Sequence, residues 1–226
     1  MTSFRAVVFD FDLTLVNTRR GMVECFNYAL AGVGLPPAEP EAIVRTIGVV
    51  LEESFPILAG TQHMDLFPQF FALYHQRSSQ DMAGMTTLYP SAHSTVRELA
   101  AWGVPLGIVS SGRRSRIEAT LHKARLFASF RSIIGREDVL APKPDPTGLL
   151  EALRRLGCAP AESFYVGDHV VDAQTAQGAG TPFIAVLSGV TPREAFAPYP
   201  HLAILGDLAE LPPFLDQLHQ PAGGQT

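Results

Sequence analysis

The amino-acid sequence predicts an α/β protein, a doubly wound parallel sheet to which a small all-helical domain is added. Three observations support this fold class. Short apolar runs alternate with helical segments through the second half of the chain. Between residues 17 and 80, helical patterns follow one another without strand patterns. A length of 226 residues is enough for one large core and a small second one.

The elements are expected in this order. The first strand is Ala6–Phe9, an apolar run that ends at an acidic cluster. Helices are expected at 22–31, 39–47, 51–58 and 65–76, and later at 91–102, 116–124, 146–156, 170–179 and 208–218. Further strands are expected at 105–109, 132–134, 164–166, 183–187 and around residue 203. Such alternation implies a parallel sheet with helices on both faces.

Boundary signals divide the chain. Asp145 as N-cap, Pro146 at the first position and Gly157 past the end frame one helix. We expect a core domain of residues 1–16 and 81–220, a helical lobe of residues 17–80 and a flexible tail of residues 221–226. The two connections between core and lobe are expected to act as hinges, near Asn17 and within residues 80–90, where Met82-Ala83-Gly84 is a candidate.

Composition excludes several classes of protein. The chain is 46% hydrophobic and 17% charged, with a formal net charge of -5 and no basic stripe, which argues against nucleic-acid binding. Its start resembles no secretion signal, so we expect no contact with a membrane. Cys25 and Cys158 lie in apolar helical contexts without CxxC spacing, and we expect buried free thiols in a reducing cytoplasm. The protein should be a monomer or homodimer.

Four acidic residues follow predicted strands. Asp10 and Asp12 come after the first strand, and Asp168 and Asp172 follow the strand around residues 164–166. Carboxyl ends of parallel strands share one edge, so these carboxylates should gather. They cannot all stay ionised at close range without a cation, and an oxygen-only set favours Mg²⁺ over Zn²⁺. An acidic turn, or a helix cap at Asp172, remains an alternative.

Two further segments suit phosphate. Ser110 and Ser111 end a predicted strand, where hydroxyls and backbone N–H groups bind phosphate oxygens, although such a pair can also cap a helix. Lys143 lies between Pro142 and Pro144, whose fixed φ angles restrict the backbone, although it could be an ordinary solvated loop lysine.

In this order, the DxDxT run at Asp10, the strand-end Ser110, the Lys-Pro-x-Pro run at Lys143 and the GDxxxD run ending at Asp172 resemble the haloacid dehalogenase superfamily. Within it the chain is similar to phosphoglycolate phosphatases, whose helical cap is inserted after the first motif. The resemblance implies a phosphatase that forms a phosphoaspartyl intermediate and acts on a small phosphorylated, phosphoglycolate-like metabolite.

The resemblance also implies roles for individual residues. Asp10 would be the nucleophile and Asp12 the general acid and base. Ser110, Ser111 and Lys143 would bind the phosphate. The Mg²⁺ ligands would be Asp10, Asp168 and the backbone carbonyl of Asp12, with Asp172 near the metal. The chemistry is consistent, because phosphoryl transfer needs an in-line nucleophile and fixed positive charge.

Two positions depart from the family pattern. Leu13 stands where a glycine is usual, so the turn must take an ordinary conformation or carry strain. Asn17 replaces an aspartate and can still cap the first cap helix.

Other functions stay open. A phosphosugar mutase of the β-phosphoglucomutase type would place anion-binding residues where Met22 and Leu51 stand. A dehalogenase would lack Asp12, and a phosphonate hydrolase would need a cap lysine, which residues 17–80 do not contain. A non-catalytic binding protein of the same fold would normally have lost an acid. Substrate contacts are conceivable for the apolar loop 47–51 and for four basic side chains: Arg19, Arg20, Arg45 and His169.

Overall fold

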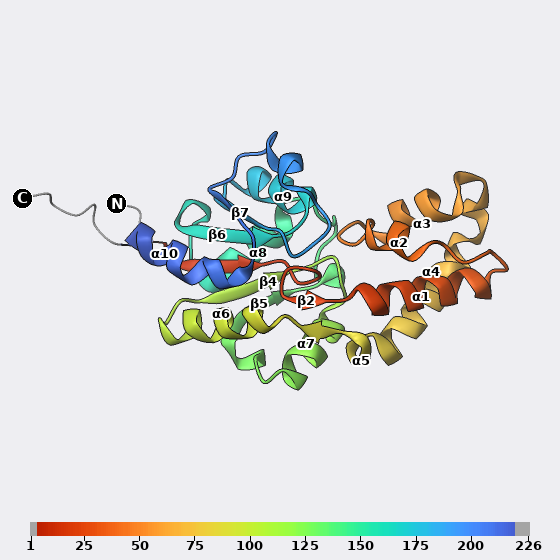
Figure 1. Ribbon diagram of the computed structural model, residues 1–226, viewed down its shortest axis with the longest axis horizontal. Helices are drawn as coiled ribbons and strands as arrows, with labels where there is room; N and C mark the ends of the chain where they lie inside the picture. Colours follow the sequence, from red (N-terminus) through yellow and green to blue (C-terminus); the bar gives the residue numbers. More distant parts are fainter. Residues whose placement is uncertain (1–3, 220–226) are drawn as a thin grey trace, which may run out of the picture.

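The computed structural model describes residues 4–219, so the predicted tail of residues 221–226 lies outside the described part. A six-stranded parallel sheet has the order β5-β4-β1-β6-β7-β8 (Figure 1). Its strands are β1 Ala6–Phe9, β4 Leu106–Val109, β5 Phe130–Ile134, β6 Ser163–Gly167, β7 Phe183–Val186 and β8 Ala203–Leu205. The predicted fold class is confirmed.

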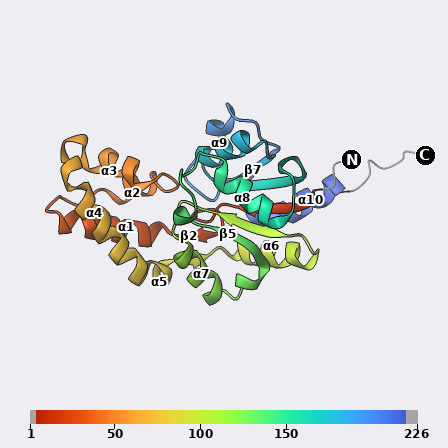
Figure 2. The same cartoon turned by 180° about the vertical axis from the view of Figure 1, so that it is seen from behind.

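Helices cover both faces of this sheet (Figures 1 and 2). Alternate residues of a strand point to opposite faces. The helices are α6 Pro90–Ala101, α7 Arg114–Lys123, α8 Thr147–Leu156, α9 Val170–Ala179 and α10 Leu211–His219. Val7 and Phe9 therefore pack in one apolar cluster with α6, α7 and α10, whereas Val8 packs in another with α8 and α9. The doubly wound arrangement follows from this alternation.

Five α-helices between residues 19 and 85 form a lobe with a core of its own, here called the cap. They are α1 Arg19–Gly32, α2 Pro40–Val44, α3 Leu51–Ala59, α4 Phe67–Arg77 and α5 Ala83–Met85, with a π-helix over Ser78–Met82. Phe26, Phe55 and Phe70 are fully buried in the cap core, with ring centroids 4.8 Å apart for Phe26 and Phe70 and 4.6 Å apart for Phe55 and Phe70. The domain boundaries themselves stay a prediction.

The two connections between cap and sheet lie side by side. β2 Val16–Asn17 pairs with β3 Thr87–Leu88 in a short antiparallel ladder. The candidate hinge at Met82–Gly84 lies within continuous helix, from the π-helix into α5. Two-residue strands show no measurable periodicity, which is why the ladder was not predicted.

Several helix boundaries differ from the prediction. The helix expected at 39–47 ends at Val44, because i→i−3 bonds from the N–H groups of Thr46 and Ile47 replace the α pattern. The helix expected from Pro146 begins at Thr147, whose N–H donates to Asp145 Oδ1 at 2.9 Å. Gly157 does end that helix in the left-handed conformation, at φ 69°.

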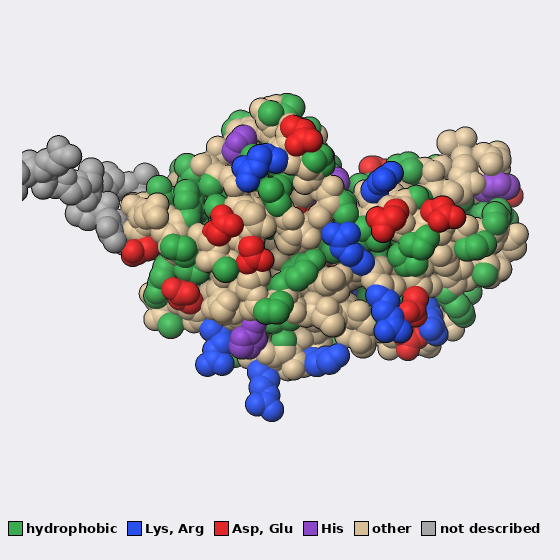
Figure 3. Space-filling view, in the orientation of Figure 1, with side chains coloured by type: hydrophobic (Ala, Val, Ile, Leu, Met, Phe, Trp, Pro, Cys, Tyr) green, Lys and Arg blue, Asp and Glu red, His purple; other side chains and the backbone are tan. Residues whose placement is uncertain are grey.

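Acidic and basic side chains are spread over both parts of the face shown in Figure 3. No helix among residues 4–219 is long and apolar enough to cross a membrane. Cys25 is buried, as expected. Cys158 is only partly buried, so that part of the prediction is wrong; it lies just past the end of α8, at the margin of the core.

Candidate active site

The predicted site residues meet at the carboxyl edge of the sheet. Asp10 follows β1, Ser110 follows β4 and Asp168 follows β6. β1 lies between β4 and β6, where the winding of the chain reverses, and such a switch point is the usual place for a ligand in an open α/β sheet. Asp10, Asp168 and Asp172 are all buried there, with carboxylate oxygens within 4.8 Å of one another.

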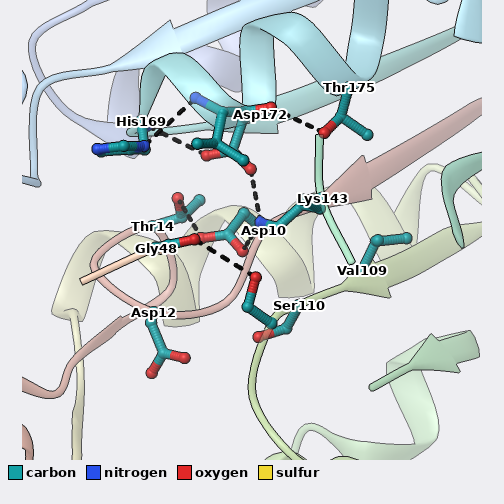
Figure 4. A network of polar contacts seen from close by, with 12 residues as sticks. Asp10, Asp12, Thr14, Gly48, Val109, Ser110, Lys143, His169, Asp172 and Thr175 are labelled. Atoms are coloured by element: carbon teal, nitrogen blue, oxygen red, sulfur yellow. Dashed lines mark hydrogen bonds and ion pairs between the residues drawn. The ribbon is translucent and has the colours of Figure 1, made fainter. Parts of the chain in front are cut away.

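Lys143 lies at the centre of this group (Figure 4). Its Nζ is 2.6 Å from Asp10 Oδ1 and 2.6 Å from Asp172 Oδ1, and the hydroxyl of Tyr165 is 3.4 Å away. Burial alone would lower the pKa of Lys143, but Asp10 and Asp172 raise it well above its ordinary value. Lys143 is therefore a buried permanent cation and not a solvated loop lysine.

Tyr165 was not predicted as a site residue. It lies in β6, where the sequence pattern predicts that an aromatic side chain belongs to the apolar core, and it is fully buried. Its hydroxyl is 3.0 Å from Asp172 Oδ1 and 3.3 Å from the carbonyl oxygen of Val109. Tyr165 therefore fixes the side of Asp172 that faces Lys143.

The acids outnumber the cations at this edge. Burial raises the pKa of Asp10 to about 7, an effect that Lys143 opposes and the neighbouring acids increase. Burial and Asp10 raise the pKa of Asp168 well above its ordinary value. Among residues 4–219, Lys143 makes the ion pairs to Asp10 and Asp172, and Asp168 has none. The positive charge of one lysine is therefore too small to balance three carboxylates.

A divalent cation fits this deficit. The hydroxyl of Thr14 donates to Asp168 Oδ1 at 2.9 Å and lies 3.4 Å from Asp10 Oδ2, so these two oxygens face a common point. All the atoms that could bind a metal here are oxygen atoms, and such a ligand set suits Mg²⁺. Both carboxylate oxygens of Asp172 already have partners, since Oδ1 faces Lys143 and Oδ2 accepts from the N–H of His169 at 3.1 Å.

The alternative of a helix cap at Asp172 is also realised. Asp172 and His169 form a reciprocal capping box at the start of α9, with His169 Nδ1 accepting from the N–H of Val171 at 3.3 Å. Burial lowers the pKa of His169. The structure thus gives His169 a capping role, and Asp172 serves both the helix and Lys143.

Asp12 points away from this network (Figure 4). Its two carboxylate oxygens accept from Arg116 Nη1 at 2.8 Å and Nη2 at 2.5 Å, with only 14% of the Asp12 side chain and 9% of the Arg116 side chain exposed. Arg116 belongs to α7 and was not predicted as a site residue. No local pattern links positions 104 residues apart, so the sequence holds no signal for this pair.

The two serines form the third side of the site. Ser110 Oγ accepts from the N–H of Gly112 at 3.0 Å, and Ser111 Oγ is 3.4 Å from the carbonyl oxygen of Gly48 in the cap. The N-cap of α7 is Arg113, so neither serine is the cap of that helix. Ser110 therefore holds the turn after β4, and Ser111 contacts the cap.

A cavity of about 300 Å³ opens from Asp10 and Asp12 toward the cap. The predicted apolar loop 47–51 lines it, as do Met22, Phe71 and Met82. Its cations are unexpected: none of the cap arginines lines it, and Arg113, Arg116 and Arg136 of the core do. His75 lines it too, and burial lowers its pKa to about 4.

The three cap arginines considered for substrate contact lie elsewhere. Arg19 Nη2 donates to the carbonyl oxygen of Gly189 at 3.1 Å, which ties the start of α1 to the loop after β7. Arg20 pairs with Glu24 on the surface, and Arg45 is exposed.

Comparison with known proteins identifies the family. Residues 7–186 match the model of the haloacid dehalogenase-like hydrolases. The chain belongs to this family. Two curated relatives are a phosphoglycolate phosphatase of Yersinia pseudotuberculosis, 34% identical over 93% of both chains, and the pyrophosphatase PpaX of Bacillus velezensis, 28% identical over 91% of this chain and 95% of that one. A crystal structure from Bacteroides fragilis, titled as a haloacid dehalogenase-like hydrolase, is 40% identical and has a TM-score of 0.88, covering 92% of this chain and all of the other. The predicted family and enzyme class, a phosphatase, are confirmed.

For a haloacid dehalogenase-like hydrolase, the turn after Asp12 is unusual. Leu13 has φ 62°, a left-handed conformation that glycine adopts without cost, so the turn carries strain. Its side chain is fully buried against Val44 and Ile47 of the cap. The second departure has little effect on the start of α1. The N-cap position of that helix is Thr18, and Asn17, one residue earlier, still accepts a hydrogen bond from the N–H of Arg19 through its Oδ1.

Proposed function

We propose that the protein is a Mg²⁺-dependent phosphomonoester hydrolase that forms a phosphoaspartyl intermediate on Asp10 and acts on a small phosphorylated metabolite. The observation that carries this proposal is the position of Asp10. Its carboxylate lies between the Lys143 ammonium, at 2.6 Å, and the Thr14 hydroxyl shared with Asp168, and it lines the cavity. That arrangement supplies a held nucleophile next to fixed positive charge, which phosphoryl transfer requires.

The residues around Asp10 would have different roles in binding the phosphate and the metal. Lys143 and the donors near Ser110 and Ser111 would hold the phosphate oxygens in line with the nucleophile. Asp10, Asp168 and the backbone carbonyl of Asp12 would hold Mg²⁺, which adds positive charge on the phosphate oxygens when bound. Asp172 keeps Lys143 in place from the far side.

The reaction then has two displacements. An oxygen of Asp10 attacks phosphorus, the bond from phosphorus to the ester oxygen breaks, and that oxygen takes a proton from Asp12. Water next attacks the phosphoryl group and gives a proton back to Asp12, and the bond to Asp10 breaks to release inorganic phosphate. Asp12 is held by Arg116 in the structure, so it must leave that pair to reach the ester oxygen.

The test is phosphate release from p-nitrophenyl phosphate and from a panel of metabolite esters, with Mg²⁺ and with chelator. Asp10→Asn should fold and be inactive, and beryllofluoride should bind on Asp10 in the unaltered protein. Asp65→Asn, on an exposed cap acid, is the matched control and should keep full activity. Substantial turnover by Asp10→Asn would refute the proposed nucleophile.

The phosphosugar mutase is not proposed. Met22 and Leu51, at the positions where it would need anion-binding groups, both line the cavity with apolar side chains.

A further inference from the structure

A loop segment after β7 holds the turn beside the candidate metal site. Ser188 Oγ donates to the carbonyl oxygen of Leu13 at 2.6 Å. Leu13 is left-handed at φ 62°, and strained conformations of this kind persist only where the surrounding structure holds them. Its neighbours in the turn are Asp12, whose carbonyl would face Mg²⁺, and Thr14, whose hydroxyl donates to Asp168 Oδ1 at 2.9 Å. Ser188 therefore holds the backbone that places these two oxygen atoms.

The next residue of the loop, Gly189, lies against one of the acids. A Cβ atom at position 189 would collide with Oδ2 of Asp168, so the loop backbone packs directly on this buried carboxylate. The hydrogen bond described for the other carboxylate oxygen comes from the hydroxyl of Thr14. The orientation of Asp168 therefore depends on where the loop lies. Outer contacts of this kind orient the ligands of a metal site and change its affinity.

Both connections between cap and core reach this same segment. Arg19 is the first residue of α1, and its Nη2 donates to the carbonyl oxygen of Gly189 at 3.1 Å and lies 3.5 Å from that of Ser188. Tyr89 follows β3 on the returning connection, and its hydroxyl donates to the carbonyl oxygen of Ser188 at 3.4 Å. A movement of α1 relative to the sheet would therefore shift or release the loop that supports the metal site.

The bonds of Arg19 go to this loop and not to an acid. Within the described part of the chain Arg19 forms no ion pair, whereas Arg20 beside it pairs with Glu24 at 2.8 Å on the surface. Hydrogen bonds from a charged donor are about twice as strong as neutral ones, so Arg19 is the strongest tie between α1 and the loop.

We propose that Arg19 is a positioning residue that couples the cap to the metal site. Through the loop at Ser188–Gly189 it holds Asp168 in the arrangement that binds Mg²⁺. Because such coupling is reciprocal, bound Mg²⁺ in turn favours the cap position in which α1 contacts this loop. This inference rests on the proposed Mg²⁺-dependent function.

The experiment measures Mg²⁺ binding by isothermal titration calorimetry on protein first stripped with chelator. In Arg19→Gln the dissociation constant should rise about 5- to 10-fold, within the usual range of coupling between two sites. In Ser188→Ala it should rise about 10-fold, the lower end of the effect of removing an outer contact. The double variant should lose much less than the product of the two single losses, because both residues act through the same loop.

Controls separate this role from a structural one. Arg20→Gln, one residue along the same helix and paired with Glu24 on the surface, should leave the Mg²⁺ dissociation constant unchanged. Arg19→Lys keeps the charge without the planar fork, so it should retain part of the affinity and serves as the test if Arg19→Gln fails to fold. The rise in melting temperature on adding Mg²⁺ should be smaller in Arg19→Gln than in Arg20→Gln, which a merely structural role of Arg19 would not produce.

Two outcomes would overturn the inference: an unchanged Mg²⁺ affinity in either single variant, or a double variant whose loss is the full product of the single losses. The second would mean that Arg19 and Ser188 act independently. In both cases, Mg²⁺ binding and Mg²⁺-dependent hydrolysis of p-nitrophenyl phosphate by the unaltered protein would show that the proposed function still stands. Failure of the unaltered protein to bind Mg²⁺ would refute the proposed metal site itself, and the inference with it.

Discussion

Lys143 Nζ lies 2.6 Å from Asp10 Oδ1, deep at the carboxyl edge of the sheet, with 5% of each side chain exposed. The lysine predicted to bind phosphate thus also holds the proposed nucleophile. The opposite contact to Asp172 at 2.6 Å prevents Lys143 from swinging away. The ammonium can therefore approach a phosphoryl group only on the side of Asp10.

Replacing Lys143 tests this double role. In Lys143→Met, two buried carboxylates lose their partner, which should destabilise the fold by about 3–5 kcal/mol where both are ionised. Turnover should fall by more than about 10²-fold, because fixed charge near the phosphoryl oxygens is lost. Lys123→Met, on an exposed lysine of α7, is the matched control and should change neither quantity.

The destabilisation by Lys143→Met should depend on pH. The pKa of Asp10 is already raised by burial to about 7, and loss of Lys143 raises it further. A folded-state pKa above the unfolded one gives a penalty that is absent below the unfolded pKa and grows as pH rises through the folded one. Chemical denaturation should therefore show a larger loss near about pH 8 than near about pH 5. Equal losses at both would contradict the buried pair.

Asp12 can be tested through the leaving group. Asp12→Asn should lose about 10²- to 10⁴-fold in turnover of an alkyl phosphate, because its ester oxygen needs a proton to leave. With p-nitrophenyl phosphate the loss should be smaller, since p-nitrophenolate leaves without one. Steady-state kinetics on the two esters measures the difference. A similar loss on both would mean that Asp12 is not the acid and acts only as the partner of Arg116.

Leu13 allows strain and packing to be separated. Leu13→Ala keeps the positive φ and removes the contact with Val44 and Ile47, so it should destabilise by about 2–5 kcal/mol. Leu13→Gly removes the same contact but relieves the strained backbone, worth about 1–2 kcal/mol. The glycine variant should therefore be the more stable of the two, as measured by denaturant unfolding. If the alanine variant is equally stable or more so, the turn carries no strain.

Part of the site could be predicted from sequence because parallel strands bring their carboxyl ends to one edge. Asp10, Ser110 and Asp168 each follow a readable apolar strand, so their convergence follows from topology. Arg116 could not be found in this way, since its contact with Asp12 depends on the rotation of α7 and on the space at Gly112. Tyr165 was missed for another reason: a buried strand tyrosine and a core phenylalanine look the same in a pattern.

The structure of the cap could also be predicted only in part from the sequence. Its amphipathic helices predict a lobe with a small core, but the residues that face the active site depend on how that lobe is docked. The docking involves Leu13 against Ile47, and Arg19 against Gly189. Neither contact has a local sequence signal, and so the cap arginines were considered for the substrate while the cavity uses arginines of the core.

The acidic edge itself predicts an effect of Mg²⁺ on stability. Asp10 and Asp168 both have pKa values raised by burial, so without metal the folded protein holds protons that the unfolded chain has released. The stability cost is absent below the unfolded pKa and grows as pH climbs through about 7, the folded pKa of Asp10. Mg²⁺ binds the ionised carboxylates and should remove most of that cost, with a further mass-action gain of about 2.7 kcal/mol at a hundredfold excess over its dissociation constant.

Melting curves of protein first stripped with chelator measure this effect. Mg²⁺ should raise the melting temperature, and more near about pH 8 than near about pH 5, because at the lower pH protons occupy the ligand oxygens. Asp168→Asn should abolish most of the rise, whereas Asp65→Asn, on the exposed cap acid, should leave it intact. A melting curve that ignores Mg²⁺ at both pH values would mean that Asp10 and Asp168 do not form a metal site, and that Lys143 alone balances the buried acids.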